Sequence, residues 1–171
     1  MNNNWEDKID SFIELANKYS VRMILVGGSA VNFHGYQRHS ADVDFWIDTK
    51  EDNMKKLVNV FQDLGYDIED FPAAVKKQEQ NISVKFSPVD FNLELITKFS
   101  VNKSFDDAYK DADQKVIKGN KVLKWNIISF DDLITSKIKS DRPKDLLDVQ
   151  QLKRIKKDKE NNISKDKGMS M

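Results

Sequence analysis

Residues 26–47 read VGGSAVNFHGYQRHSADVDFWI, and this stretch decides the fold. It begins where Gly27-Gly28 interrupts a short apolar run, 21–26, which has the length of a strand. Residues 29–34 then predict a short helix that ends at Gly35. Apolar residues alternate with others from 42 to 48, and this period of two predicts a second strand.

The glycine pair is the first candidate binding feature. Two glycines allow the backbone to turn sharply and let a ligand approach the amides closely, while the start of a helix offers unpaired N–H groups to an anion. The Ser29 hydroxyl would then either cap the helix or bond a phosphate. Taken alone, the same pattern is more typical of an ordinary strand-to-helix turn with a serine cap.

Asp42 and Asp44 are the second feature. Residues two apart in a strand point to the same face, so the two carboxylates project together. Like charges this close raise each other's pKa unless a cation lies between them. Mg²⁺ accepts such oxygen ligands and is completed by phosphate oxygens and water. The alternative is an exposed edge strand with solvated acids.

Glu94 is the third feature. In the predicted strand 91–96, Phe91, Leu93 and Leu95 share one face, and Glu94 lies on the other. If this strand pairs beside the Asp42 strand, Glu94 becomes the third carboxylate of a cluster. Such a triad can hold one or two metal ions for phosphoryl or nucleotidyl transfer. If it does not, Glu94 lies on a solvated sheet face.

Four basic residues are candidates for phosphate contacts, although each alone is more typical of a solvated surface: Arg38, Lys137, Arg142 and Lys144. Lys137 is the strongest candidate of the four, because it lies beside Ile134 and Ile138 on an otherwise apolar helix stripe. The two histidines, His34 and His39, form no paired motif, and we interpret both as structural or peripheral.

Periodicity along the whole chain predicts an α+β (mixed α/β) fold with a mixed sheet, flanking helices and C-terminal helices. Capping boxes at Thr49 and Ser129 predict two helix starts, and Gly119-Asn120 predicts a hairpin turn. Further helices are expected at 5–19, 104–112 and 144–156, and further strands at 82–86, 115–118 and 122–128. We expect one domain over 1–155 and a polar tail, 156–171, that is disordered or a frayed helix end.

The composition of the chain excludes several classes of protein and of site. The 171 residues include 28 Lys and Arg against 28 Asp and Glu, so the chain lacks the overall basic field of a general nucleic-acid binder. The absence of cysteine excludes disulfides, thiolate zinc sites and cysteine nucleophiles. No apolar run approaches the ~20 residues of a membrane span, and the first residues lack the layout of a signal peptide. These features predict a soluble, cytoplasmic, single-domain protein.

The residues Gly27-Gly28-Ser29, Gly35, Arg38, Ser40 and 42–47 together resemble the signature of the DNA polymerase beta-like nucleotidyltransferase superfamily. The stretch is most similar to small bacterial members, the minimal nucleotidyltransferases and the abortive-infection type toxins. Lys137 followed by Arg142-Pro143-Lys144-Asp145 resembles their C-terminal helical pair, so the likeness covers roughly 21–152. The sequence departs from the family pattern at two places. The third acid is Glu94 where relatives often have Asp, and Asp90 just upstream is a rival for that role. The residue before Asp42 is Ala41.

The resemblance implies the polymerase beta-like fold and a role for each matching residue. Asp42, Asp44 and Glu94 would be the catalytic acids that bind Mg²⁺, with Mn²⁺ as the alternative metal. The nucleoside triphosphate would be held by Gly27, Gly28, Ser29, Arg38, Ser40 and Lys137. Of these, Arg38 and Lys137 would neutralise phosphate charge.

The implied reaction is attack of an acceptor hydroxyl on the α-phosphate of a nucleoside triphosphate, with release of pyrophosphate. A tRNA or a partner protein in a toxin–antitoxin or phage-defence system is the predicted acceptor, and the Lys-rich segment after Leu152 favours such a contact. Two alternatives stay open: an enzyme that modifies an antibiotic hydroxyl, and a catalytically silent binding or antitoxin module of the same fold. The intact set of Asp42, Asp44 and Glu94 favours an enzyme.

Overall fold

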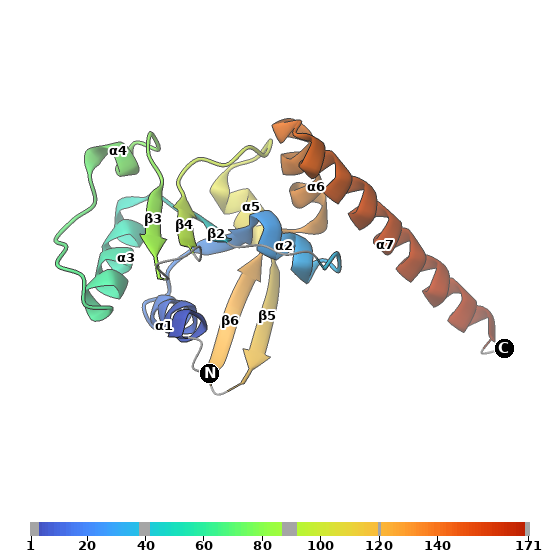
Figure 1. The fold of residues 1–171 in the computed structure, drawn as a ribbon, viewed down its shortest axis with the longest axis horizontal. Helices are drawn as coiled ribbons and strands as arrows, with labels where there is room; N and C mark the ends of the chain where they lie inside the picture. Colours follow the sequence, from blue (N-terminus) through green and yellow to red (C-terminus); the bar gives the residue numbers. More distant parts are fainter. Residues whose placement is uncertain (1–3, 38–41, 87–91, 120, 170–171) are drawn as a thin grey trace.

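The computed structural model describes residues 4–37, 42–86, 92–119 and 121–169. Within them the chain forms one mixed sheet flanked by helices (Figure 1), which confirms the predicted fold class. The strands are β1 Met23–Val26, β2 Asp42–Ile47, β3 Ile82–Lys85, β4 Asn92–Ile96, β5 Asp113–Lys118 and β6 Val122–Ile127. The helices are α1 Asn4–Lys18, α2 Gly27–Phe33, α3 Glu51–Asp63, α4 Ala73–Lys76, α5 Phe105–Asp111, α6 Phe130–Ser140 and α7 Pro143–Met169.

The sheet has the strand order β3-β4-β2-β1-β6-β5. β2 pairs antiparallel with β1 on one side and parallel with β4 on the other. β1 also pairs in parallel with β6, while β3 and β5 add antiparallel neighbours at the two edges. The predicted hairpin of β5 with β6 is confirmed, although Asn120 of its turn lies outside the described residues.

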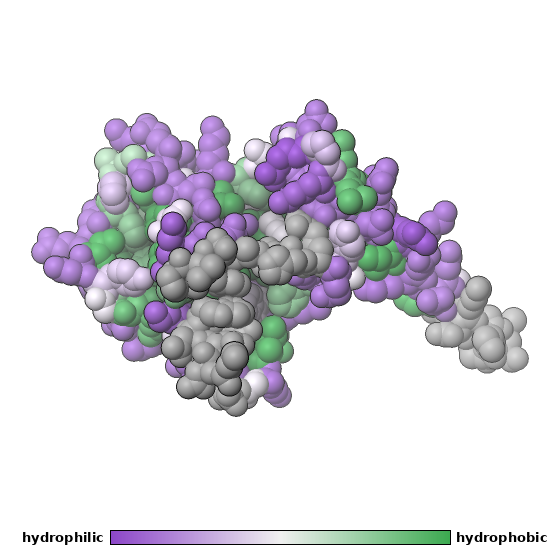
Figure 2. Space-filling view, viewed as in Figure 1, coloured by the Kyte–Doolittle hydropathy of each residue, from purple (hydrophilic) through white to green (hydrophobic). Residues whose placement is uncertain are grey.

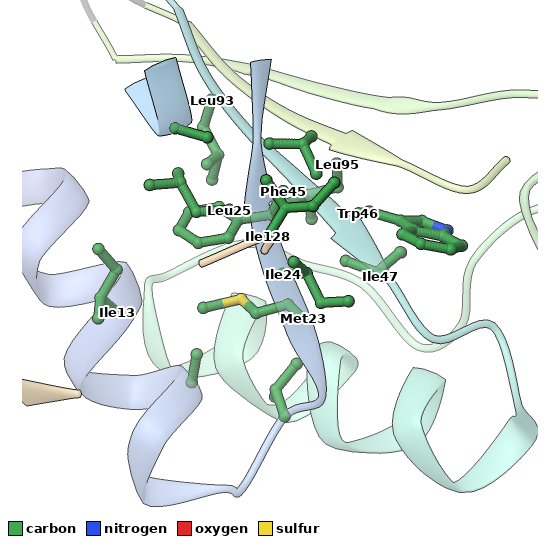
Figure 3. Packing of buried hydrophobic residues seen from close by; sticks show 14 of the residues in the cluster. Ile13, Met23, Ile24, Leu25, Phe45, Trp46, Ile47, Leu93, Leu95 and Ile128 are labelled. Carbon is green, nitrogen blue, oxygen red and sulfur yellow. The ribbon is translucent and has the colours of Figure 1, made fainter. Parts of the chain in front are cut away.

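An aromatic cluster fixes three helices on one face of the sheet. The Phe45 ring of β2 lies 6.2 Å from Phe12 of α1 and 5.8 Å from Trp125 of β6. Phe12 in turn contacts Phe61 of α3, and Trp125 contacts Phe33 of α2. In Figure 3, Phe45 lies among the buried core side chains close to Leu25 of β1. This burial drives the packing of α1, α2 and α3 against β2.

The opposite face of β2 carries Asp42, Asp44 and Trp46, because side chains alternate along a strand. In Figure 3, the Trp46 ring points away from Phe45 and Leu25. Its ring lies 5.4 Å from Phe99 and 5.2 Å from Phe105 at the start of α5. The segment 97–105 therefore covers this face at the end of β2, beside the two acids.

One of the two predicted helix caps is correct. At α6, the Ser129 hydroxyl accepts a hydrogen bond from the backbone N–H of Asp132, whereas the Asp132 carboxylate pairs with Lys103 and does not complete the box. At α3 the prediction is wrong, because the N-cap is Lys50 and no side chain caps the helix. The Thr49 hydroxyl instead accepts a hydrogen bond from the Gln78 amide, a partner 29 residues away along the chain.

α7 continues to Met169, so residues 156–169 are helical where a disordered or frayed tail was expected. The run contains no proline and reaches no glycine before Gly168, and its many Lys residues favour helix. In Figure 1 this helix runs away from the sheet to the C-terminus, and Figure 2 shows a mainly hydrophilic surface along it. No helix in the described part of the chain is long and apolar enough to cross a membrane.

Candidate active site

The parallel register of β2 and β4 brings the predicted acids together. Asp44 lies opposite Glu94, and Asp42 lies opposite Asn92 one pleat earlier. Leu93 and Leu95 are fully buried, so Glu94 faces the other side of the sheet, with the two aspartates. The condition under which Glu94 joins the two aspartates is therefore met, because its strand pairs beside the Asp42 strand. The rival Asp90 lies outside the described residues.

Asp44 is the electrostatic centre of this group. Burial first, and then the nearby charges of Asp42 and Glu94, raise the pKa of its carboxyl to about 6. The positive charges of Lys137 and Lys144 act in the opposite direction but do not compensate. An excess of negative charge therefore faces one side of β2 and β4, and a cation bound there would relieve it.

The donor chemistry fits a hard divalent ion, because carboxylate oxygens are the ligands that Mg²⁺ prefers. Among the described residues, however, no three His, Asp or Glu side chains stand close enough together to hold a metal as they are. The three acids share a face and a register without forming a closed cage. Their role as metal ligands stays a prediction.

Gly27 lets the backbone approach Asp44 closely. Its φ of +69° belongs to the left-handed region, and a Cβ at this position would lie 2.5 Å from Asp44 Oδ2. A side chain here would both strain the backbone and displace the carboxylate. This glycine therefore keeps the Asp44 carboxylate against the end of β1.

We expect Gly27→Ala to displace the Asp44 carboxylate and to lower nucleotide transfer at least tenfold. Gly65→Ala is the matched control, because Gly65 also has a positive φ, +97°, but a Cβ added there would meet no atom within 4 Å. Both variants should lose about 1–2 kcal/mol of stability from the left-handed backbone. Equal activity in the two variants would show that the contact with Asp44 is unimportant.

Ser29 does not cap α2. Its hydroxyl donates a hydrogen bond to the backbone carbonyl of Asp42 at 3.2 Å. The N-cap of α2 is Val26, without a side-chain hydrogen bond, so the predicted serine cap is wrong. Ser29 thus ties α2 to the first residue of β2, and Gly28 is buried beside it. Their contact with a triphosphate stays a prediction.

Lys137 is buried, and its ammonium is held by two carboxylates from α7. The Nζ atom lies 3.0 Å from Asp145 Oδ1 and 3.2 Å from Asp148 Oδ2. Lys137 is 6% exposed, and both aspartates are buried more deeply still. The charge of Lys137 is therefore already matched, and this ion-paired cluster joins α6 to α7.

Asp145 was part of the motif that carries the resemblance, but reasoning from sequence gave it no role. Burial acts to raise the pKa of its carboxyl, but hydrogen bonds from Ser140, Arg142 and Lys137 outweigh it and lower the pKa to about 2. Arg142, a candidate phosphate contact, is thus engaged with Asp145. The signal in the sequence was an acid eight positions after Lys137, across the turn at Pro143.

A pocket of about 260 Å³ joins these two parts of the chain. Asp44 lines it from β2 and Gly27 from the start of α2, while Lys137 of α6, Asp145 of α7 and Arg142 between these helices line the other side. Lys98 and Phe99 close a third side. Arg38 and Ser40, two further predicted site residues, lie outside the described residues, as does His39.

His34 has the structural role expected for it. Its Nε2 atom lies 2.7 Å from the Ile128 carbonyl oxygen, and its ring packs edge-on against Phe130. It therefore joins α2 to the start of α6.

Comparison with known proteins places the chain. It is similar to the crystal structure of ANT(2")-Ia in complex with adenylyl-2"-tobramycin, with 11% identity, 85% of each chain covered and a TM-score of 0.46. No curated protein matches it. Residues 7–163 match the family described as nucleotidyltransferase of unknown function (DUF6036). Because this match spans the glycine turn, the acids of β2 and β4 and the Lys137 cluster, the chain belongs to that family of nucleotidyltransferases.

Proposed function

We propose that the chain transfers a nucleoside monophosphate from a nucleoside triphosphate to an acceptor hydroxyl, in a reaction that depends on Mg²⁺. The observation that carries the proposal is the alignment of Asp44 with Glu94 on one sheet face, with Asp42 beside them. The pKa of Asp44, raised to about 6 by burial and by its acidic neighbours, supports a cation at this place.

In this reaction the acceptor oxygen forms a bond to the α-phosphorus, and the bond from that phosphorus to the bridging oxygen breaks. Pyrophosphate leaves with the electron pair, and the hydroxyl proton passes to a carboxylate of Asp42, Asp44 or Glu94. Bound Mg²⁺ would supply stabilisation of the charge that develops on the phosphate oxygens. Gly27, Gly28 and Ser29 at the end of β1, together with Arg38, Ser40 and Lys137, are the proposed contacts to the triphosphate.

The acceptor follows from the resemblance in the sequence rather than from the site. A hydroxyl of tRNA or of a partner protein, in a toxin–antitoxin or phage-defence system within the cytoplasm, is the first proposal. Modification of an antibiotic hydroxyl is the second. Experiment decides between these two classes of acceptor. The nucleotide that the chain binds is identified before the acceptor.

Thermal unfolding with each of the four ribonucleoside triphosphates, with and without Mg²⁺, tests the proposal. A ligand at a hundred times its dissociation constant adds about 2.7 kcal/mol, which should raise Tm by roughly 5–10 °C for a chain of this length. The shift should require Mg²⁺ and should disappear in Asp44→Asn. Asp113→Asn, an exposed acid on the edge strand β5, should keep it. A shift that survives in Asp44→Asn would overturn the assignment of this site.

A further inference from the structure

A second pocket of about 370 Å³ adjoins the Asp44 pocket. Lys98 and Phe99 line both, so the two cavities meet at these residues. The second pocket lies over the end of β2, between the loop after β4 and the start of α5. Its volume lies in the range of small-molecule sites. None of the described residues proposed above to contact the triphosphate lines this second pocket.

Aromatic rings form one wall of the second pocket. Trp46 packs between Phe99 and Phe105, with ring centroids 5.4 and 5.2 Å from its own. Trp46 is only 5% exposed and belongs to β2, so it supports the two phenyl rings from the sheet. Phe99 and Phe105 are partly exposed and complete the lining. A planar aromatic ligand can stack on such a surface.

The side-chain amide of Gln78 also lines the second pocket. The Gln78 Nε2 atom donates a hydrogen bond to Thr49 Oγ1 at 2.9 Å, and this bond anchors the side chain. Gln78 has a φ of +62°, a backbone conformation uncommon for a residue other than glycine. Within the described residues, the second N–H and the oxygen of its side-chain amide make no hydrogen bond. An amide with one donor and one acceptor available matches the edge of a nucleobase.

The charges around the pocket leave one exposed cation at the junction. Lys50 is paired with Asp106 at 2.6 Å. Lys103 is paired with Asp111 and Asp132, each at 2.9 Å. Lys98 has no ion-pair partner in the described part of the chain, and its exposed side chain lies at the junction of the two pockets. An anionic group that passes between the pockets would meet Lys98 first.

We infer that the second pocket binds the nucleobase of the nucleoside triphosphate, with Phe99 as the stacking surface, Gln78 at the base edge and Lys98 beside the phosphates. The inference rests on the proposed function, because the phosphates of the same ligand occupy the Asp44 pocket. A nucleotide combines the planar ring that the aromatic wall accepts with the negative charge that Lys98 attracts.

The test compares ligands that share phosphates but differ in the base. Dissociation constants are measured by calorimetry with Mg²⁺ for ATP, GTP, CTP, UTP and inorganic tripolyphosphate. We expect the preferred nucleotide to bind at least tenfold more tightly than tripolyphosphate. Phe99→Leu, which keeps an apolar side chain but removes the ring, should weaken that nucleotide about tenfold and leave tripolyphosphate within twofold. Thermal unfolding without ligand checks that each variant folds.

Gln78→Ala should reduce the preference among the four bases, whereas Gln114→Ala on the exposed edge strand β5 should leave it unchanged. Lys98→Ala should weaken every nucleotide and tripolyphosphate alike. If tripolyphosphate binds as tightly as the nucleotides, or if Phe99→Leu affects neither, the second pocket does not hold the base. In that case Mg²⁺-dependent binding that is lost in Asp44→Asn would still support the proposed function, and its absence would overturn both.

Discussion

Asp44→Asn will abolish nucleotide transfer and, at the same time, raise the Tm of the ligand-free chain. Activity is lost because the amide cannot supply the charged oxygen that a metal ion requires. Stability rises because the native fold holds the Asp44 carboxyl in an environment that opposes its charge, through burial first and the charges of Asp42 and Glu94 second. A residue important only for folding would show the opposite effect on stability.

The direction follows from the raised pKa. The carboxyl has its ordinary pKa of 3.8 in the unfolded chain and about 6 in the folded chain. Between these values the folded state binds more proton than the unfolded state, so stability falls as pH rises from about 4 to 6. Above pH 6 the charged carboxyl lowers the free energy of unfolding by its full amount. Because solvent partly screens this group, we expect that amount to be about 1–2 kcal/mol.

At pH 7.5 we therefore expect Asp44→Asn to unfold roughly 2–8 °C above the unsubstituted chain, measured by calorimetry without metal. At pH 4 the two Tm values should converge. In the unsubstituted chain, Mg²⁺ binding should weaken about tenfold for each pH unit below 6, because the ion must displace the proton of Asp44. A lower Tm for the variant at pH 7.5 would contradict the electrostatic account.

Lys137→Met should strongly lower the stability of the chain, in contrast to Asp44→Asn. It removes the cation that pairs with both buried carboxylates, Asp145 and Asp148, while Asp145 keeps its hydrogen bonds from Ser140 and Arg142. The expected cost is therefore about 3 kcal/mol, the lower end of the range for a broken buried ion pair, which corresponds to a fall in Tm of roughly 6–12 °C. The effect should appear as loosened packing of α7 against α6, since the ion pairs join the two helices.

Lys139→Met on the same helix is the matched control, because its side chain is exposed and the change should stay within about 0.5 kcal/mol. Adding Asp148→Asn to Lys137→Met should recover part of the loss, since one of the two buried charges disappears. Denaturant unfolding measures all three. Equal stability of the two single variants would mean that the carboxylates do not depend on Lys137.

Local sequence was sufficient where the deciding atoms lie close together along the chain. The alternation in 42–48 placed Asp42 and Asp44 on one face of β2, and the Ser129 box predicted the start of α6. The same reasoning failed at Thr49 and Ser29. Their hydroxyls bond to Gln78 and to the Asp42 carbonyl, partners that only the folded chain brings near.

The sequence by itself determined the mixed fold, the glycine turn, the paired acids and the family, because each depends on residue types at short, regular spacings. Only the tertiary structure decided that Glu94 lies opposite Asp44, since strand register is set by which apolar faces are buried together. It also decided that Lys137 is held by Asp145 and Asp148. Burial of a charge requires a partner, and the partner comes from whichever helix packs against it.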